Sequence, residues 1–207
     1  MGTSKRTDGI ATMERLRDAA VQELTRNGLE KFNLEDVLHR ADAARSSLYH
    51  HFGNKSRLIE AAQLAHLKAT LTEDNAALRT VVETVSSPQE LVDVVFLWLK
   101  EMGKKPSLNL RRQRISTLAA AEHSSEIASA LKRNQISGTT YFAETLEIAK
   151  ERGFINPQIE IRALAYWIQG QFVGRALLDV SKESDLDEAW AEATLASLIA
   201  VLGVPLK

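Results

Sequence analysis

Four polar side chains in one short segment have the types and the spacing needed to read a nucleic acid. They belong to Arg45, Ser46, Tyr49 and His50. Their spacing places them on one face of a helix that we expect over residues 45–51. An arginine near the start of such a helix can donate two hydrogen bonds to guanine in the DNA major groove, and the other three can bond to bases or phosphates. The segment therefore predicts direct reading of double-stranded DNA.

The opposite face of the same helix is apolar. Leu48 and Phe52 lie four residues apart and therefore point the same way, which we expect to be inward. Gly53 can end the helix, because glycine readily takes the backbone conformation of a helix C-terminus. Lys55 follows at the start of the next helix, where a cation beside free backbone N–H groups suits a phosphate.

A second short helix is expected immediately before this one, starting near Leu34. Asn33 can cap its N-terminus, and Asp36 three residues later favours the helix dipole. Ala41 is small enough to let a crossing helix come close. Residues 42–44 then form a turn of the length that joins the two helices of a helix-turn-helix.

The order Tyr-x-His-Phe-x-x-Lys at residues 49–55 resembles the DNA-binding domain of the tetracycline-repressor (TetR) family. The resemblance covers residues 11–62. Two positions depart from the family pattern, since Asp42 stands where the family usually has glycine and Ala44 where it usually has a hydroxyl cap. Aspartate can enter the left-handed backbone region, so the turn is feasible. The missing cap costs about 1 kcal/mol of local helix stability.

The resemblance implies an all-α protein of about nine helices. An N-terminal three-helix helix-turn-helix DNA-binding domain would occupy residues 1–57, and a helical effector-binding and dimerisation domain residues 58–207. The implied function is a DNA-binding transcriptional regulator, a ligand-responsive homodimeric repressor of a palindromic operator, with activation left open. Its partners would be double-stranded DNA, a second copy of the chain and a small-molecule effector. DNA contacts are expected from Asn33, Arg45, Ser46, Ser47, Tyr49, His50 and Lys55.

Helices are predicted along the rest of the chain. Apolar side chains at spacings of three and four predict a first helix that ends at residues 27–28. No strong breaker occurs from Ser56 to about Val85, so a long helix should lead out of the DNA-binding domain. Pro88 suits the first turn of the next helix. Further helices are expected over residues 107–121, 124–152, 157–180 and 186–202.

The middle helices are expected to enclose an effector pocket, as the resemblance implies. The predicted lining consists of Trp98, Met102, Tyr141, Phe142 and Trp167, with His123 and Gln171 as polar anchors. The alternative is a plain hydrophobic core, since large apolar residues on helices usually pack internally. His123 can equally be solvated at a helix junction, and residues 111–114 (Arg-Arg-Gln-Arg) are expected to form an exposed basic face.

The two final helices are expected to pair with their copies across a two-fold axis. Gly170 and Gly174 lie four residues apart and would permit close approach, although packing within one chain explains them nearly as well. Phe172, Trp190 and Leu198 would supply apolar area. The dimer also follows from the DNA side, because one short recognition helix reads few bases. Two-fold symmetry would supply two half-sites about one helical turn apart.

Composition and charge agree with such a regulator. The 207 residues include 44% hydrophobic and 26% charged residues, as in ordinary globular chains. The absence of cysteine excludes disulfides and thiol catalysis and suits the cytoplasm. No apolar stretch is long enough to span a membrane. Residues 1–57 carry a net charge of +2 (ten Lys/Arg, eight Asp/Glu) and the remainder −3. We therefore expect few phosphate contacts per subunit and reliance on two subunits.

The sequence offers no catalytic or metal-binding constellation. Its five histidines are scattered, and it contains no His-Glu-x-x-His motif, glycine-rich phosphate loop or nucleophile elbow. We expect no enzymatic activity, no metal and no cofactor. The remaining alternative is a helical protein-interaction or ligand-binding module of the same fold that does not read specific DNA, to which the departures at Asp42 and Ala44 give some weight.

Overall fold

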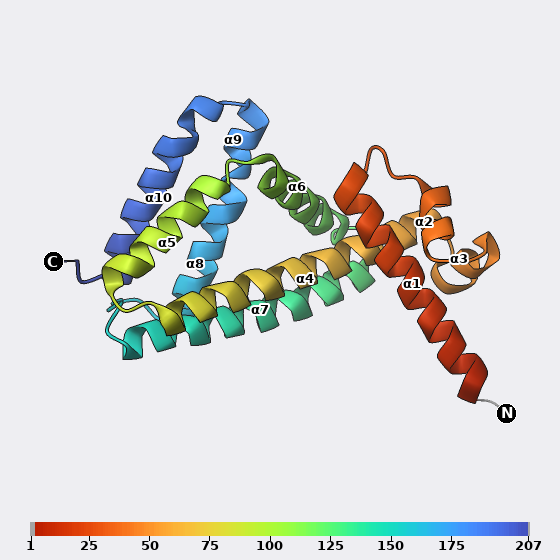
Figure 1. Cartoon of the computed structure of the whole chain (residues 1–207), viewed down its shortest axis with the longest axis horizontal. Coiled ribbons are helices and arrows are strands. Elements are labelled where there is room, and N and C mark those ends of the chain that lie inside the picture. The colour runs from red at the N-terminus through yellow and green to blue at the C-terminus, as the bar shows by residue number, and fades with distance from the viewer. Residues whose placement is uncertain (1–2, 207) are drawn as a thin grey trace. The chain divides into compact units, whose positions relative to one another are not determined.

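The structure, a computed structural model, describes the backbone of residues 3–206 and the side chains of residues 8–104 and 107–206. Within this range every regular element is helical, which confirms the all-α fold (Figure 1). The α-helices are α1 (Thr3–Asn27), α2 (Leu34–Arg40), α3 (Arg45–Phe52), α4 (Lys55–Thr84), α5 (Pro88–Glu101), α6 (Lys105–Ala120), α7 (Ser125–Glu151), α8 (Ile161–Gly174), α9 (Ala176–Ser181) and α10 (Asp187–Leu202). A short 3-10 helix, η1 (Ser184–Leu186), precedes α10.

The helix ends lie within a few residues of the predicted ones, with one exception. The helix expected over residues 157–180 is two helices, because the chain breaks at Arg175 between α8 and α9. This break accounts for ten described α-helices where about nine were expected.

The residues form two compact units. The first comprises Met1–Ala69 with Thr117–Ala130, and the second Thr70–Ser116 with Leu131–Lys207. The helices α4, α6 and α7 each run from one unit into the other. The domain boundary expected at residues 57–58 therefore lies within the first unit near the start of α4, and it stays a prediction.

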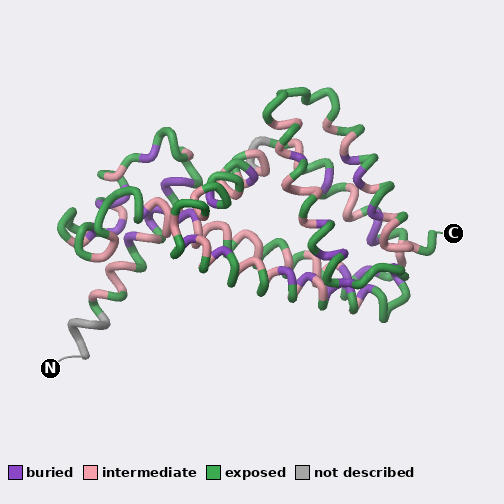
Figure 2. The backbone as a smooth tube through the Cα atoms, turned by 180° about the vertical axis from the view of Figure 1, so that it is seen from behind, coloured by how far each residue is buried: buried purple, intermediate pink, exposed green. Residues whose placement is uncertain are grey.

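The core of the first unit is built by α1, α2, α3 and the start of α4, with α1 packing against both α2 and α3. Its fully buried members include Leu16, Val37, Leu48 and Leu58, one from each helix. Figure 2 shows the buried stretches of the backbone in purple. Burying such a side chain contributes about 1.5–3 kcal/mol, so these contacts hold the short helices α2 and α3, which would not be stable alone.

Two glycines end helices of this unit where the sequence predicts, and an asparagine side chain caps the start of the next helix. Gly28 has a φ of +70° and donates its N–H to the carbonyl of Leu24 at 2.9 Å, which closes α1. Gly53 has a φ of +78° and closes α3 in the same way on Tyr49. The side chain of Asn54 then accepts the N–H of Arg57 at 2.9 Å and caps α4.

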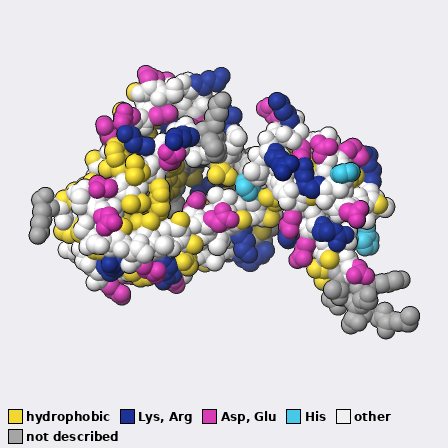
Figure 3. Space-filling view, viewed as in Figure 1, with side chains coloured by type: hydrophobic (Ala, Val, Ile, Leu, Met, Phe, Trp, Pro, Cys, Tyr) yellow, Lys and Arg dark blue, Asp and Glu magenta, His cyan; other side chains and the backbone are white. Residues whose placement is uncertain are grey.

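The second unit has its own apolar core, formed by α4, α5, α7, α8 and α10. Leu99, Leu146, Leu164 and Ile168 are among its buried members. Ser87 caps α5 by accepting the N–H of Glu90 at 3.2 Å, and Pro88 occupies the first turn as predicted. Figure 3 shows apolar side chains gathered over this unit on one face, bordering a hollow.

A buried ionic network joins α6 to α9 in the second unit. Arg111 is 8% exposed and donates to both carboxylate oxygens of Asp179, at 2.6 and 2.8 Å, and to the carbonyl of Met102 at 2.8 Å. Arg175, 2% exposed, pairs with Asp179 and Asp187. The expectation that residues 111–114 form an exposed basic face is therefore wrong for Arg111. Its ion-pair partner Asp179 lies 68 residues away in sequence, so the pair could not be recognised from the local sequence.

Among the described residues, no helix is both long enough and apolar enough to cross a lipid bilayer. The same part of the chain contains no group of three or more side chains arranged to hold a metal ion.

Candidate nucleic-acid interface

The side chain of Asn33 starts α2. It accepts the N–H of Glu35 at 3.0 Å, and its own backbone is extended, as an N-cap requires. The acids Glu35 and Asp36 lie in the first turn and His39 and Arg40 in the last, so the charges at both ends favour the helix dipole. The sequence-based assignment of Asn33 as the capping residue is confirmed.

The turn between α2 and α3 is short and tightly bonded. Asp42 has a φ of +46°, the left-handed conformation in which the family pattern has glycine. Ala43 donates its N–H to the carbonyl of Leu38 at 3.1 Å, which closes the turn. Ala44 begins α3 without a side-chain cap, as its residue type requires. Both departures from the family pattern are therefore accommodated without changing the helix-turn-helix.

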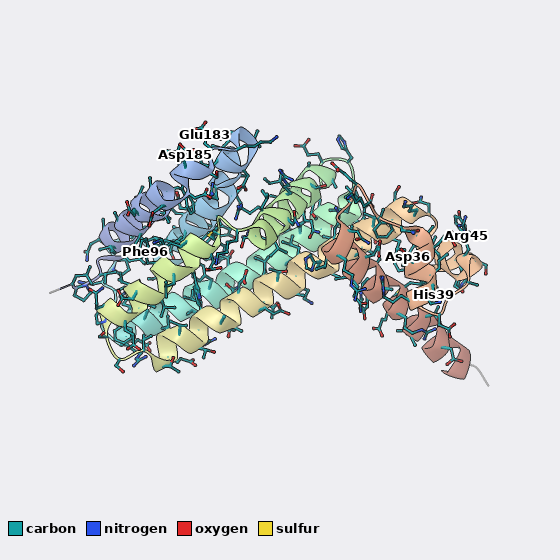
Figure 4. All side chains as sticks on the ribbon, turned by 45° about the horizontal axis from the view of Figure 1, so that its top comes forward. Asp36, His39, Arg45, Phe96, Glu183 and Asp185 are labelled. Atoms are coloured by element: carbon teal, nitrogen blue, oxygen red, sulfur yellow. The ribbon has the colours of Figure 1, made fainter. Side chains whose placement is uncertain are left out.

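The two faces of α3 differ as the sequence predicts. Leu48 is 0% exposed and Phe52 packs against the same core. On the other side Tyr49 is 53% exposed, and Arg45, Ser46 and His50 are also exposed. Figure 4 shows Arg45 projecting from the outer end of α3. The outer face of this helix therefore offers hydrogen-bonding groups and the inner face only apolar contacts.

Ser47 and His51 take intermediate positions on α3. Both side chains are half-buried, and the ring of His51 lies 4.9 Å from that of His50 in an edge-to-face arrangement. Ser47, one of the predicted DNA contacts, is therefore less available than Ser46.

Lys55 lies beside the start of α2 in addition to starting α4. Its ammonium donates to the carbonyl of Phe32 at 3.3 Å and lies 5.3 Å from the centroid of that ring. Phe32 directly precedes the capping residue Asn33. The structure thus brings together Lys55 and Asn33, two residues that are predicted to contact DNA and that lie 22 residues apart in sequence.

Glu23 is the one fully buried acid of the first unit among the described side chains. It accepts hydrogen bonds from the Asn27 amide at 2.7 Å, the Asn33 N–H at 3.2 Å and the Arg40 guanidinium at 3.3 Å. These bonds, led by the one from Asn27, lower the pKa of Glu23 below its ordinary value although burial acts in the opposite direction. Glu23 is therefore ionised at neutral pH.

A short turn, a buried anchor at Leu48 and an exposed polar face on α3 define a helix-turn-helix DNA-binding protein. Residues 16–62 match the family described as "Bacterial regulatory proteins, tetR family". These residues therefore form a DNA-binding domain of the TetR type, and the findings support a DNA-binding transcriptional regulator.

Similarity to known proteins extends over most of the chain. The HTH-type transcriptional regulator UidR of Escherichia coli (strain K12) is 23% identical over 160 residues, which cover 77% of this chain and 76% of that protein. The crystal structure of reduced E. coli NemR matches with a TM-score of 0.65 and 17% identity, over 94% of this chain and 100% of that one. A TetR transcription regulator from Haloarcula marismortui ATCC 43049 matches with a TM-score of 0.64 and 11% identity, over 92% and 98%. The curated relative is a transcriptional regulator and not an enzyme.

The predicted effector-binding residues do not share one environment. Phe142 is buried in the core of the second unit, and Met102 packs against that core. Trp98 and Trp167 are 37% and 38% exposed. His123 is exposed at the break between α6 and α7, in the first unit.

The other two predicted effector contacts have partners close by. The guanidinium of Arg79 lies 4.8 Å from the centroid of the Tyr141 ring. The amide of Gln171 approaches the carbonyl of Trp167, one turn earlier in α8, at 3.5 Å. The assignment of these residues to an effector stays a prediction.

The predicted dimer residues divide into two groups. Gly170 and Gly174 are exposed on α8, and outside the adjoining residues and the nearby backbone of α8 no described atom lies within 4 Å of the position that a Cβ would take at either glycine. Leu198 is 7% exposed within the protomer's own core, and Phe172 and Trp190 pack against that core. The glycines are therefore accessible to a partner, whereas most of the apolar surface of the other three residues is already buried within the protomer.

Two polar clusters of the second unit were not predicted from the sequence. One is the Arg111–Asp179 network, and the other joins α7 to α8, where Gln135 donates to Thr139 at 3.0 Å and to Gln169. A polar residue within an apolar helix stripe is the signal for such clusters, but its partner cannot be found without the fold.

Proposed function

We propose that the protein is a homodimeric repressor that reads a palindromic operator through α3 and releases it when an effector binds. The observation that carries the proposal is the contrast across α3, with Leu48 fully buried and Tyr49 53% exposed beside Arg45. A helix held this firmly on one face and polar on the other suits insertion into the major groove. Arg45, Ser46, Tyr49 and His50 would face the bases, with Ser47 at the edge of this set.

Asn33 and Lys55 would contact the phosphate backbone. The N-terminus of α2 presents backbone N–H groups and the positive end of the helix dipole, and the ammonium of Lys55 lies next to it at Phe32. Such contacts fix the register of α3 on the duplex and carry no sequence information themselves.

The dimer would form through an exposed apolar stripe along α8 and α9. Its members share one side of the two helices and are Tyr166, Trp167, Gly170, Gly174, Leu177 and Val180. Leu177 and Val180 are 78% and 81% exposed, values that are unusual for aliphatic side chains next to one another. This stripe retains the predicted glycine pair and replaces Leu198 with residues that are free to contact a second copy.

An effector would bind within the second unit and favour a state in which the two α3 helices no longer fit the spacing of the half-sites. Ligand responsiveness is typical of the family. The helix α4 begins at Lys55 in the first unit and ends in the second, so a shift along it can link the two events. The effector can change the equilibrium only through its difference in affinity for the two states.

Selection of duplexes from a random pool by the full chain tests the DNA-reading part. We expect enrichment of a two-fold symmetric sequence with half-sites about one helical turn apart. Failure to enrich any sequence would favour the alternative, a helical module of the same fold without specific DNA reading.

The oligomeric state tests the dimer stripe. Mass measurement in solution should give a dimer for the wild-type chain and a monomer for Leu177→Glu, because the substitution places a charge in the proposed interface. Glu183→Gln, at an exposed position after α9, serves as a control and should leave the dimer intact. A wild-type monomer at micromolar concentration would contradict the paired half-site proposal.

A further inference from the structure

Glu23 is a buried charge that none of the proposed DNA contacts uses. It lies on α1 at 0% exposure, between the buried residues Ala20 and Leu24. A carboxylate in apolar surroundings is costly unless its partners are close and well oriented. The position of those partners therefore indicates what the residue holds in place.

The two oxygens of Glu23 bond to opposite ends of α2. Oε1 accepts the N–H of Asn33, the residue that caps the start of α2, at 3.2 Å. Oε2 accepts from Nη2 of Arg40, the last residue of α2, at 3.3 Å. The helix has only seven residues, so the Glu23 side chain on α1 can form hydrogen bonds at both of its ends.

The guanidinium of Arg40 is directed at α1 through both of its terminal nitrogens. Nη1 donates to the carbonyl of Ala19 at 3.0 Å while Nη2 bonds to Glu23. The Arg40 side chain is 26% exposed. Its charge is therefore balanced within the protein and is not presented to a phosphate.

Apolar packing alone would fix α2 less completely. Val37 and Leu38 bury apolar area against α1, but such contacts have no preferred direction and tolerate small rotations. Hydrogen bonds weaken steeply when their angle is lost. The bonds of Glu23 therefore fix the rotation and the sliding of α2 on α1, which the packing leaves partly free.

We propose that Glu23 is a positioning residue for DNA reading, which sets the orientation of α2 and, through the short turn at residues 41–44, that of α3. The inference rests on the proposed operator reading. Glu23 itself touches no DNA. Its loss should therefore reduce the discrimination between operator and other duplexes and leave the electrostatic part of binding unchanged.

The test compares Glu23→Gln with the wild-type chain on the selected operator and on a scrambled duplex of equal length, at several salt concentrations. Glutamine keeps the size of the side chain but removes its charge and introduces a donor facing other donors. We expect operator affinity to fall about tenfold, which corresponds to about 1.4 kcal/mol of binding free energy. Affinity for the scrambled duplex and the salt slope should stay as in the wild type.

Asp18→Asn is the matched control. Asp18 also lies on α1 and pairs with Arg17 at 3.0 Å, but its side chain is 61% exposed and bonds to no part of α2. Both variants remove one negative charge from the same helix, so their long-range effects on DNA binding are alike. The control should bind the operator at least as well as the wild type does.

Arg40→Gln removes the other partner of the Glu23–Arg40 pair, whose side chain is only partly buried, and it decides the question if Glu23→Gln does not fold. We expect the same loss of operator affinity, an unchanged salt slope, and partial recovery in Arg40→Lys. A salt slope flattened by about one unit would instead make Arg40 a phosphate contact and overturn the proposal. A folded Glu23→Gln variant with wild-type operator affinity would overturn it equally. A wild-type chain that selects no operator would contradict the proposed function and the inference with it.

Discussion

The carboxylate of Glu35, in the first turn of α2, pairs with the guanidinium of Arg45, the first residue of α3. Both side chains are more than half exposed. In the DNA-free protein the proposed base-reading group is therefore oriented and partly neutralised by an acid of the preceding helix. To bind guanine, Arg45 must share that acid or leave it, so Glu35 influences both the affinity and the selectivity of binding.

Replacement of Glu35 by glutamine should raise the affinity for every duplex and lower the ratio of operator to scrambled affinity. The increase should reach at most about fivefold, because exposed ion pairs contribute about 0–1 kcal/mol. Fluorescence anisotropy titrations on the two duplexes measure both quantities.

Asp36→Asn removes the same charge from the same turn, but Asp36 is not the partner of Arg45 (Figure 4). This control should raise both affinities and leave their ratio unchanged. An identical ratio in the two variants would show that the Glu35–Arg45 pair has no part in selectivity.

Lys55→Ala should weaken binding to all sequences alike and flatten the salt dependence of binding by about one unit per subunit, since one phosphate contact is lost. Titrations between low and moderate salt on operator and scrambled DNA measure the slope. Lys150→Ala, an exposed lysine on α7 in the second unit, should leave the slope unchanged. A change restricted to the operator would assign Lys55 to base reading instead.

The local features of the helix-turn-helix were predictable because their causes are local. Asn33 as a cap, Gly53 as a terminator and the inward position of Leu48 follow from residue type and spacing over a few residues. The left-handed conformation expected at Asp42 also follows from its residue type, and the structure confirms the positive φ.

The features that sequence reasoning missed depend on partners far apart in the chain. Glu23 and Arg40 are 17 residues apart, and Arg111 and Asp179 are 68 apart. A charged residue within or beside a helix gives no sign of such a partner before the helices are packed. Leu198 was assigned to the dimer interface for the same reason. Its apolar side chain fits a protomer core and a dimer interface equally well until the helices are packed, and in the structure it lies in the core.

Asp179→Asn should lower the free energy of unfolding by about 3–5 kcal/mol, because it leaves Arg111 and Arg175 buried without their shared acid. Urea unfolding of the full chain measures this loss. Glu188→Gln removes an exposed acid that pairs with Lys100 at 2.7 Å and should change the same free energy far less, because solvent screens an exposed ion pair. Equal effects of the two variants would contradict the structural role of the buried network.

The contribution of Glu23 to stability should vanish at low pH. Its pKa is lower in the folded chain than the ordinary value of 4.5, so it stabilises the fold above that value and loses the effect as pH falls through the folded pKa. The difference in unfolding free energy between wild type and Glu23→Gln should therefore be constant near neutral pH and shrink below about 4.5. Urea unfolding at stepped pH measures it, and a difference that grows on acidification would contradict the account.

The most direct test of DNA reading through α3 is a parallel titration of wild-type and Arg45→Ala chains against the selected operator and the same operator with its half-sites scrambled, at one salt concentration. Loss of the arginine should cost about 1–3 kcal/mol on the operator and much less on the scrambled duplex. The base preference at the contacted position should relax at the same time. Unchanged operator affinity in Arg45→Ala would contradict the assignment of this face of α3 as the one that reads DNA.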